Sequence, residues 1–257
     1  MTYLRAEKLD LAYGTRRVVE ELDLEIPERS FTAIVGPNAC GKSTTLRALV
    51  RLLRPQGGEV LLDDRPLRSW ASKAVARVLG FLPQGTITPD GIRVEGLVRR
   101  GRYAHQGALG TWAARDDAVV AEAMAAAGVT ELATRTVGEL SGGQRQRVWI
   151  AMVLAQETPY LLLDEPTTFL DIAHQFELLR LLRRLVDEGR TVVVVLHDLN
   201  QACRFADYVV AMHEGQVVAS GPPVEVIDAA LVEKVFGLPC IVVPDPITGT
   251  PMVVAYA

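Results

Sequence analysis

One stretch, residues 31–53, limits what this chain can fold into more than any other. Its first five residues are mostly apolar and predict a short buried strand. A tight loop with two glycines follows, and then a helix whose apolar residues are spaced to share one face. That face consists of Leu46, Leu49, Val50 and Leu53. A strand, a loop and a helix in this order form the context in which phosphate-binding loops occur.

The loop has the pattern G-x-x-x-x-G-K-S. Its backbone N–H groups and those of the helix start point into one concavity, which suits an anion. In this pattern Lys42 reaches the β- and γ-phosphates and the Ser43 hydroxyl holds Mg²⁺. We therefore predict that the chain binds a nucleoside triphosphate through Gly36, Pro37, Asn38, Ala39, Cys40, Gly41, Lys42, Ser43 and Thr44. A helix N-terminus tends to lower a thiol pKa, yet we interpret Cys40 as a small filler residue.

Composition excludes several other classes of protein. The 257 residues are 49% hydrophobic, enough for a sizeable core, and the net charge of −4 argues against a nucleic-acid partner. The arginines at 16–17, 99–102 and 183–184 are typical of solvated faces. No apolar run reaches the roughly 18 residues of a membrane span. The N-terminal residues lack the apolar segment of a signal peptide, so we expect a cytosolic chain. Three widely spaced cysteines argue against disulfides and zinc.

Periodicity predicts the order of elements along the rest of the chain. Residues 3–9 and 18–26 alternate and predict an antiparallel strand pair, and residues 59–62 predict another strand. Residues 72–79 predict a short helix capped by Ser72, and a strand ends at residues 81–84. From about residue 92 to 158 the chain turns helical. Its clearest helix covers residues 116–127 and stops at Gly128.

Apolar strands at 160–163 and 191–196 flank an amphipathic helix. Its predicted buried face contains Ile172, Phe176, Leu179, Leu182 and Val186. Apolar strands alternating with amphipathic helices predict an α/β fold with a parallel sheet covered on both sides. We expect a nucleotide-binding core at residues 1–91 and 159–257, with a helical subdomain inserted at 92–158. The role of residues 238–257 does not follow from the sequence.

Two carboxylates end the strand that begins at Tyr160. Ligands collect at the carboxyl ends of parallel strands, and successive strand residues point to opposite sides, so Asp164 and Glu165 take different tasks. Asp164 suits Mg²⁺, either as a direct ligand or through a bound water, and Glu165 suits polarisation of an attacking water. A charged loop after a strand is the alternative.

A second anion-binding helix start is predicted at residues 140–144, LSGGQ. Ser141 is a natural N-cap, and the glycines Gly142 and Gly143 let backbone N–H groups approach an anion closely. A plain helix cap is the alternative.

The motifs GPNACGKST, LSGGQ, LLLDEP and a strand ending in His197 occur in the order of an ABC-type ATPase cassette, which the chain resembles over almost its whole length. The resemblance implies an ATP hydrolase with a mixed sheet covered by helices, an antiparallel β subdomain and a helical subdomain. It implies Mg²⁺ ligation by Ser43, Gln84 and Asp164, and catalysis by Lys42, Glu165 and His197. Further nucleotide-binding residues implied by the resemblance are Tyr13, Gln84, Ser141, Gly142, Gly143, Gln144 and Asp171.

In that family Tyr13 would stack on adenine, although a tyrosine there could also be strand packing, and His197 would contact the γ-phosphate. Two cassettes sandwich two ATP molecules, so Ser141 would act on the ATP of a second copy. One departure is Ala39, where many cassettes carry glycine. The loop pattern does not require glycine there if φ stays negative, so we expect activity to be intact.

Residues 166–175, 197–207 and 244–251 resemble the bacterial importers of ferric siderophores, haem and cobalamin, and the siderophore branch most. This implies transmembrane permease subunits that contact a groove near Gln84, a substrate-binding protein, and a place at the cytoplasmic face of the membrane. A DNA-repair ATPase of the superfamily would need a long coiled coil between Gln84 and Leu140, and a ribosome-acting one would carry two cassettes. A metabolic kinase would lack LSGGQ. Haem or cobalamin import stays open, and a non-transport role is the less favoured alternative.

Overall fold

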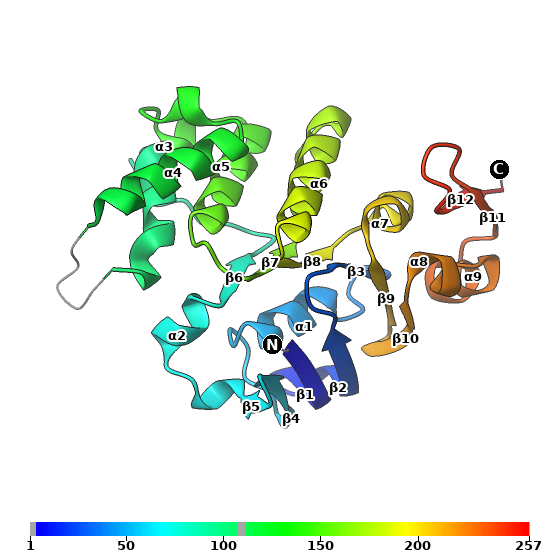
Figure 1. Cartoon of the computed structure of the whole chain (residues 1–257). Coiled ribbons are helices and arrows are strands. Elements are labelled where there is room, and N and C mark those ends of the chain that lie inside the picture. The colour runs from blue at the N-terminus through cyan, green and yellow to red at the C-terminus, as the bar shows by residue number, and fades with distance from the viewer. Residues whose placement is uncertain (1–3, 107–111, 257) are drawn as a thin grey trace. The chain divides into compact units, whose positions relative to one another are not determined.

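The computed structural model describes residues 4–106 and 112–256, which form two compact units. The first unit contains residues 1–70 and 185–257, and the second contains residues 71–184. Figure 1 labels their helices and strands. Within the described ranges, no helix is both long enough and apolar enough to span a bilayer. The predicted division into a nucleotide-binding core and a helical subdomain inserted at residues 92–158 stays a prediction.

An antiparallel sheet forms one part of the first unit. Its strands are β1 (Leu4–Tyr13), β2 (Arg16–Ile26), β4 (Gly57–Leu62) and β5 (Arg65–Pro66), in the order β2-β1-β4-β5. This confirms the predicted strand pair, with β1 continuing to Tyr13. Apolar residues alternate along both long strands, so one face of the sheet is buried and the other faces water.

Parallel strands form the other part of the first unit. Strand β3 (Phe31–Val35) lies between β8 (Thr191–Val195) and β9 (Tyr208–His213), parallel to both. The last strand, β10 (Gln216–Gly221), is antiparallel to β9, which makes the sheet mixed. Every residue of β3 and β8 is buried, as their apolar, β-branched composition requires.

Helix α1 (Lys42–Leu49) is shorter than the sequence indicated. Leu46 and Leu49 are fully buried as predicted, but Val50 and Leu53 lie beyond the helix end. The chain turns because Arg51 adopts a left-handed conformation with φ of 62°, while the Leu52 N–H donates to the Arg47 carbonyl at 2.8 Å. This type of C-terminal turn satisfies carbonyls that the helix would otherwise leave unpaired.

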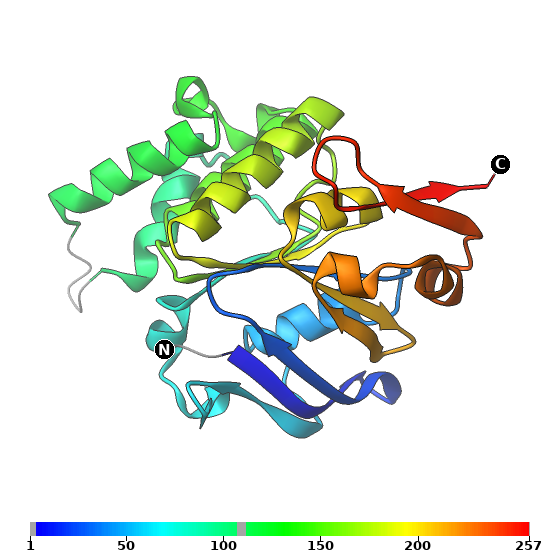
Figure 2. The same ribbon diagram turned by 45° about the vertical axis from the view of Figure 1, so that its right-hand side comes forward.

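The C-terminal part of the first unit is helical and then ends in a hairpin. It contains α7 (Leu199–Phe205), α8 (Pro223–Val226), α9 (Ala229–Phe236), β11 (Cys240–Pro244) and β12 (Pro251–Ala255). The two strands pair antiparallel, with β12 against α7 and β11 against α9; Figure 2 shows this end of the chain in red. The Pro/Gly-rich tail is therefore an ordered hairpin.

The second unit pairs two parallel strands, β6 (Leu79–Leu82) and β7 (Tyr160–Asp164), with a group of helices. The α-helices are α2 (Ser72–Ala76), α3 (Val94–Arg99), α4 (Ala114–Ala126), α5 (Gly142–Leu154) and α6 (Ile172–Asp187), whose last three residues belong to the first unit. Short 3₁₀ turns are η1 (Leu67–Ser69) in the first unit, and η2 (Arg100–Ala104), η3 (Thr130–Leu132) and η4 (Val137–Glu139) in the second.

Two local predictions in this unit were wrong and one is confirmed. Ser72 is the first residue of α2, and Ala71 occupies the cap position without a side-chain hydrogen bond. Ile172 is 74% exposed because it is the first residue of α6, where a side chain points back beyond the helix. Gly128 has φ of 62° directly after α4 and ends it as predicted.

Candidate nucleotide-binding site

The phosphate loop connects β3 to α1 within the first unit, and its glycines are required by crowding. A Cβ on Gly36 would lie 2.1 Å from the carbonyl oxygen of Met212, and one on Gly41 would lie 2.9 Å from Val19 Cγ2. Both residues also have positive φ, 151° and 106°. Only glycine fits such positions without displacing the neighbouring strands.

Lys42 is the first residue of α1 and is 4% exposed. Its ammonium donates to the carbonyl oxygens of Gly36 at 2.9 Å and Pro37 at 2.7 Å. Within the part of the chain that the structure describes, no carboxylate lies within ion-pair distance of Lys42 Nζ. The Cys40 sulfur lies 4.0 Å from the same ammonium, so its printed partners are all neutral. A buried ammonium with neutral partners is further stabilised by an anion, so the loop fits a phosphate group.

The thiol of Cys40, inside the same loop, is buried. Burial raises its pKa, and this outweighs the nearby Lys42 charge and the local hydrogen bonds, which would lower it. A helix N-terminus does not activate this thiol, and the structure supports the interpretation of Cys40 as a filler residue.

Ala39 contradicts the sequence-based expectation about its backbone. Its φ is 64°, in the left-handed region, whereas the argument for tolerance of alanine assumed a negative φ. The side chain is exposed, so no crowding excludes the Cβ, and the departure from glycine costs only local backbone strain.

Two further predicted residues lie in the first unit. Tyr13 ends β1 as a residue that is 46% exposed, and its hydroxyl accepts a hydrogen bond from Arg47 Nη1 at 3.3 Å. An aromatic residue this exposed is available for stacking. His197 is exposed and follows β8 just before the helix cap of α7. The first unit thus holds Tyr13, residues 36–44 and His197.

The two carboxylates of the second unit, Asp164 and Glu165, differ in backbone conformation. Asp164 is the last residue of β7 and is fully buried. Glu165 leaves the strand with φ of 52°, so strand alternation is not what separates the two side chains. The Glu165 carboxylate accepts hydrogen bonds from Gln84 Nε2 at 2.6 Å and from Thr168 Oγ1 at 3.5 Å. Gln84 and Glu165, 81 positions apart, are thus directly connected.

Ser141 is the N-cap of α5, as predicted. Its hydroxyl accepts from the Gln144 N–H at 3.2 Å, while the Gln144 side chain accepts from the Ser141 N–H at 3.2 Å. This reciprocal capping box orients the helix start, and Ser141 and Gly142 remain exposed. A Cβ on Gly143 would lie 3.2 Å from the Phe169 carbonyl oxygen, so the loop before α6 packs on these glycines.

The same loop ends at Asp171, just before α6. The Asp171 carboxylate accepts from the His174 N–H at 2.9 Å and contacts His174 Nδ1 at 2.7 Å. These hydrogen bonds, the backbone one first, lower the pKa of Asp171. Gln146 Nε2 donates to the Pro166 carbonyl at 3.1 Å, which ties α5 to the loop start. The second unit thus holds Gln84, residues 141–144, Asp164, Glu165 and Asp171.

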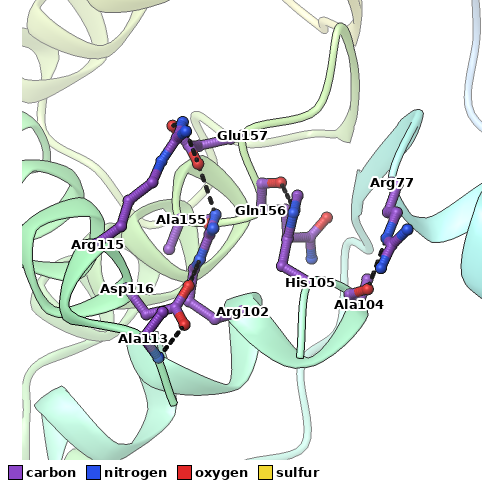
Figure 3. A network of polar contacts seen from close by, with 10 residues as sticks. All are labelled: Arg77, Arg102, Ala104, His105, Ala113, Arg115, Asp116, Ala155, Gln156 and Glu157. Atoms are coloured by element: carbon purple, nitrogen blue, oxygen red, sulfur yellow. Dashed lines mark hydrogen bonds and ion pairs between the residues drawn. The ribbon is translucent and has the colours of Figure 1, made fainter. Parts of the chain in front are cut away.

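Sequence reasoning missed a polar network that joins η2, α4 and the segment between α5 and β7, drawn in Figure 3. Arg102 is 3% exposed and donates to Asp116, to Glu157 and to the Ala155 carbonyl, each at 2.8 Å. The prediction that this arginine cluster marks a solvated face was wrong for Arg102, because its carboxylate partners are brought to it by the fold. Its two partners lie 14 and 55 positions away, and no local pattern reveals them.

Comparison with known proteins gives consistent results. The sequence model described as "ABC transporter" matches residues 19–168. The chain is 54% identical to the ferric enterobactin transport ATP-binding protein FepC of Escherichia coli (strain K12), over 98% of this chain and 93% of that protein. It is 50% identical to the petrobactin import ATP-binding protein FpuD of Bacillus anthracis, with the same coverage, 98% and 93%. It is 42% identical to the hemin import ATP-binding protein HmuV of Thermobifida fusca (strain YX), over 97% and 87% of the two chains.

Solved structures show the same architecture. An ABC transporter in an inward-facing conformation superposes with a TM-score of 0.84 at 28% identity, covering 100% of this chain and 98% of the matched chain. A bacterial ABC transporter cassette solved as a dimer gives a TM-score of 0.77 at 28% identity, covering 85% and 98%. The predicted fold class is confirmed by these similarities.

Proposed function

This chain belongs to the ABC transporter family, and from that premise we propose that it is the ATPase subunit of a bacterial importer for ferric siderophores. As a member of the family it binds and hydrolyses ATP. The observation that carries the cargo proposal is that relatives named for ferric enterobactin and petrobactin are more similar to it than a relative named for hemin. In the proposed assembly, permease subunits hold the chain at the cytoplasmic face of the membrane, and a substrate-binding protein supplies the cargo.

In the proposed mechanism Lys42 holds the β- and γ-phosphates of ATP. Its ammonium is already confined by two loop carbonyls, so little side-chain entropy remains to be lost when the phosphates arrive. The backbone N–H groups of residues 37–44 supply further donors, and the exposed Tyr13 ring stacks on the adenine.

Mg²⁺ fits the chemistry of the predicted donors, because hydroxyl, amide and carboxylate oxygens are the ligands that this hard cation prefers. The Ser43 hydroxyl, Gln84 and the buried Asp164 would hold it. When bound, the ion neutralises charge that develops on the phosphate oxygens.

Glu165 is the proposed general base. Its carboxylate is buried and oriented by the hydrogen bond from Gln84, which fixes the direction in which it can accept a proton from water. Because Gln84 is also the residue predicted to lie near the permease groove, this bond gives the permease a direct route to the base. His197 contacts the γ-phosphate in this proposal.

The proposed working unit is a dimer of two copies. Ser141 and Gly142 are exposed, as contact with the ATP of a second copy requires. The capping box uses the N–H groups of Ser141 and Gln144, so in this proposal the N–H groups of Gly142 and Gly143 serve that ATP. ATP then favours the closed dimer by several kcal/mol, and hydrolysis reopens it.

The substitution Glu165→Gln tests this mechanism. It removes the base and keeps the side-chain shape, so we expect hydrolysis to fall by about 10² to 10⁴ while ATP binding persists and a dimer accumulates. Glu177→Gln, on an exposed position of α6, is the matched control. Hydrolysis at the wild-type rate in Glu165→Gln would remove Glu165 from the proposed role.

Uptake assays test the cargo. A strain lacking this gene should lose uptake of iron-labelled ferric siderophores and keep uptake of haem and cobalamin, and the wild-type gene should restore the loss whereas Lys42→Ala should not. Loss of haem uptake with siderophore uptake intact would instead favour haem, the second candidate, to which a relative at 42% identity points.

A further inference from the structure

Helix α7 starts two residues after His197 and is only seven residues long. Its first turn is capped by Asp198, whose carboxylate accepts from the Gln201 N–H at 3.0 Å. So short a helix has little stability of its own, and its position depends on what it packs against. One face packs against β3, where Ala202 and Cys203 are fully buried.

The other anchor of α7 is the C-terminal hairpin. Asn200 and Arg204 are four positions apart and therefore lie on one face of the helix. Asn200 Nδ2 donates to the Val253 carbonyl at 3.2 Å, and Asn200 Oδ1 accepts from the Val253 N–H at 2.7 Å. The side-chain amide thus pairs with β12 as a backbone amide of a neighbouring strand would.

Arg204 forms an ion pair with Asp245, at the start of the turn between β11 and β12. Asp245 also organises that turn, because its carboxylate accepts from the N–H groups of Ile247 at 2.8 Å and Thr248 at 3.1 Å. Its own N–H donates to the Thr250 carbonyl at 2.7 Å. A turn with this many internal bonds is a rigid attachment point.

We propose that the C-terminal hairpin acts as a strap on α7 and that Asn200, Arg204 and Asp245 are positioning residues for His197. The two bonded contacts are one helical turn apart, so together they fix both the tilt and the rotation of the helix. His197 lies three residues before Asn200, so any tilt of α7 moves the histidine directly. The proposal rests on the proposed role of His197 in hydrolysis and assigns a task to residues 238–257.

The segments that the strap joins include residues 197–207 and 244–251, two of the three stretches that resemble siderophore importers. In the structure these stretches contact each other through Arg204 and Asp245. A contribution to stability alone would not require the attachment to lie next to the catalytic histidine.

The test measures ATP hydrolysis and ATP affinity of the full-length chain with Arg204→Ala and Asn200→Ala. We expect kcat to fall about tenfold while the Kd for ATP stays within about twofold, because only the placement of His197 changes. Arg204→Lys keeps the charge and should recover most of the rate. Arg17→Ala and Glu233→Gln, at exposed positions of the first unit, should hydrolyse at the wild-type rate. Urea unfolding checks that each variant is folded under assay conditions.

Combination with His197→Ala separates the possible outcomes. If the strap acts through His197, Arg204→Ala slows the wild-type chain but adds nothing to His197→Ala. An equal further loss in that background overturns the proposal, and so does an Arg204→Ala variant with wild-type kcat when His197→Ala is slow. If His197→Ala itself hydrolyses ATP normally, the proposed role of His197 fails, and the strap has no catalytic target.

Discussion

Lys42 of the first unit and Arg102 of the second are both almost fully buried cations, yet the fold treats them in opposite ways. Arg102, 3% exposed, contacts two carboxylates and a carbonyl, as Figure 3 shows. Lys42, 4% exposed, donates to two carbonyls. The charge of Arg102 is neutralised within its own unit. Lys42 keeps a positive charge that the described residues around it solvate but do not cancel.

The difference separates a structural cation from a ligand-binding one. A cation that has its own carboxylates contributes to folding, since removal of the cation strands buried negative charge. A cation whose partners are neutral contributes little to folding and much to the binding of an anion. Substitution of Arg102 should therefore lower mainly the stability, and substitution of Lys42 should lower mainly the rate of ATP hydrolysis.

The largest expected effect is on stability, from Arg102→Ala. Without the guanidinium, Asp116 and Glu157 lose their buried partner, and breaking a buried pair in this way costs about 3–5 kcal/mol. Urea unfolding at neutral pH measures the loss. The control is Arg115→Ala in the same network, because that side chain is 75% exposed and its pair with Glu157 is worth about 0–1 kcal/mol. Equal losses in the two variants would contradict the assignment of Arg102 as the structural charge.

The second prediction concerns turnover, from Lys42→Ala. We expect ATP hydrolysis to fall at least about a hundredfold, as removal of a buried donor to a developing charge does. Because no carboxylate among the described residues pairs with Lys42, the free energy of unfolding should change by less than about 1 kcal/mol. Lys234→Ala, an exposed lysine of the first unit, is the control for both measurements. Retained turnover with a large loss of stability would reverse the comparison.

The third prediction uses pH to examine the Arg102 network. The Ala113 N–H and then the Arg102 side chain hold the pKa of Asp116 below its ordinary 3.8. A lowered pKa in the folded state means that the stabilisation is complete above the ordinary value and is lost as pH falls through the folded one. Asp116→Asn should therefore be less stable than wild type at neutral pH, and the difference should shrink below about pH 4. Glu122→Gln, at an exposed position of the same helix, is the control and should have about the stability of wild type at both pH values.

The same contrast explains how far the sequence could predict the molecule. Strand β3, the phosphate loop, the Ser141 cap and the end of β7 were predicted because short patterns of fixed spacing determine them. The burial of Arg102 and the attachment of Arg204 to Asp245 were not, since their partners lie 14 to 55 positions away and no local pattern relates them. Individual backbone angles were the other failure. Glu165 and Ala39 both adopt positive φ, at 52° and 64°, which residue type alone does not indicate.

The smallest expected effect comes from Ala39, and it tests whether the backbone of the phosphate loop is strained. An L-residue in the left-handed region carries about 1–2 kcal/mol of strain, whereas glycine carries none there but loses more entropy on folding. Ala39→Gly should therefore raise the free energy of unfolding by up to about 1 kcal/mol, measured by urea unfolding, with ATP turnover unchanged. Ala121→Gly, at an exposed position inside α4, should lower it by about 1 kcal/mol. If both substitutions destabilise equally, the backbone of Ala39 is not strained. The phosphate loop that holds Lys42 would then be as relaxed as helix α4, which contains Asp116.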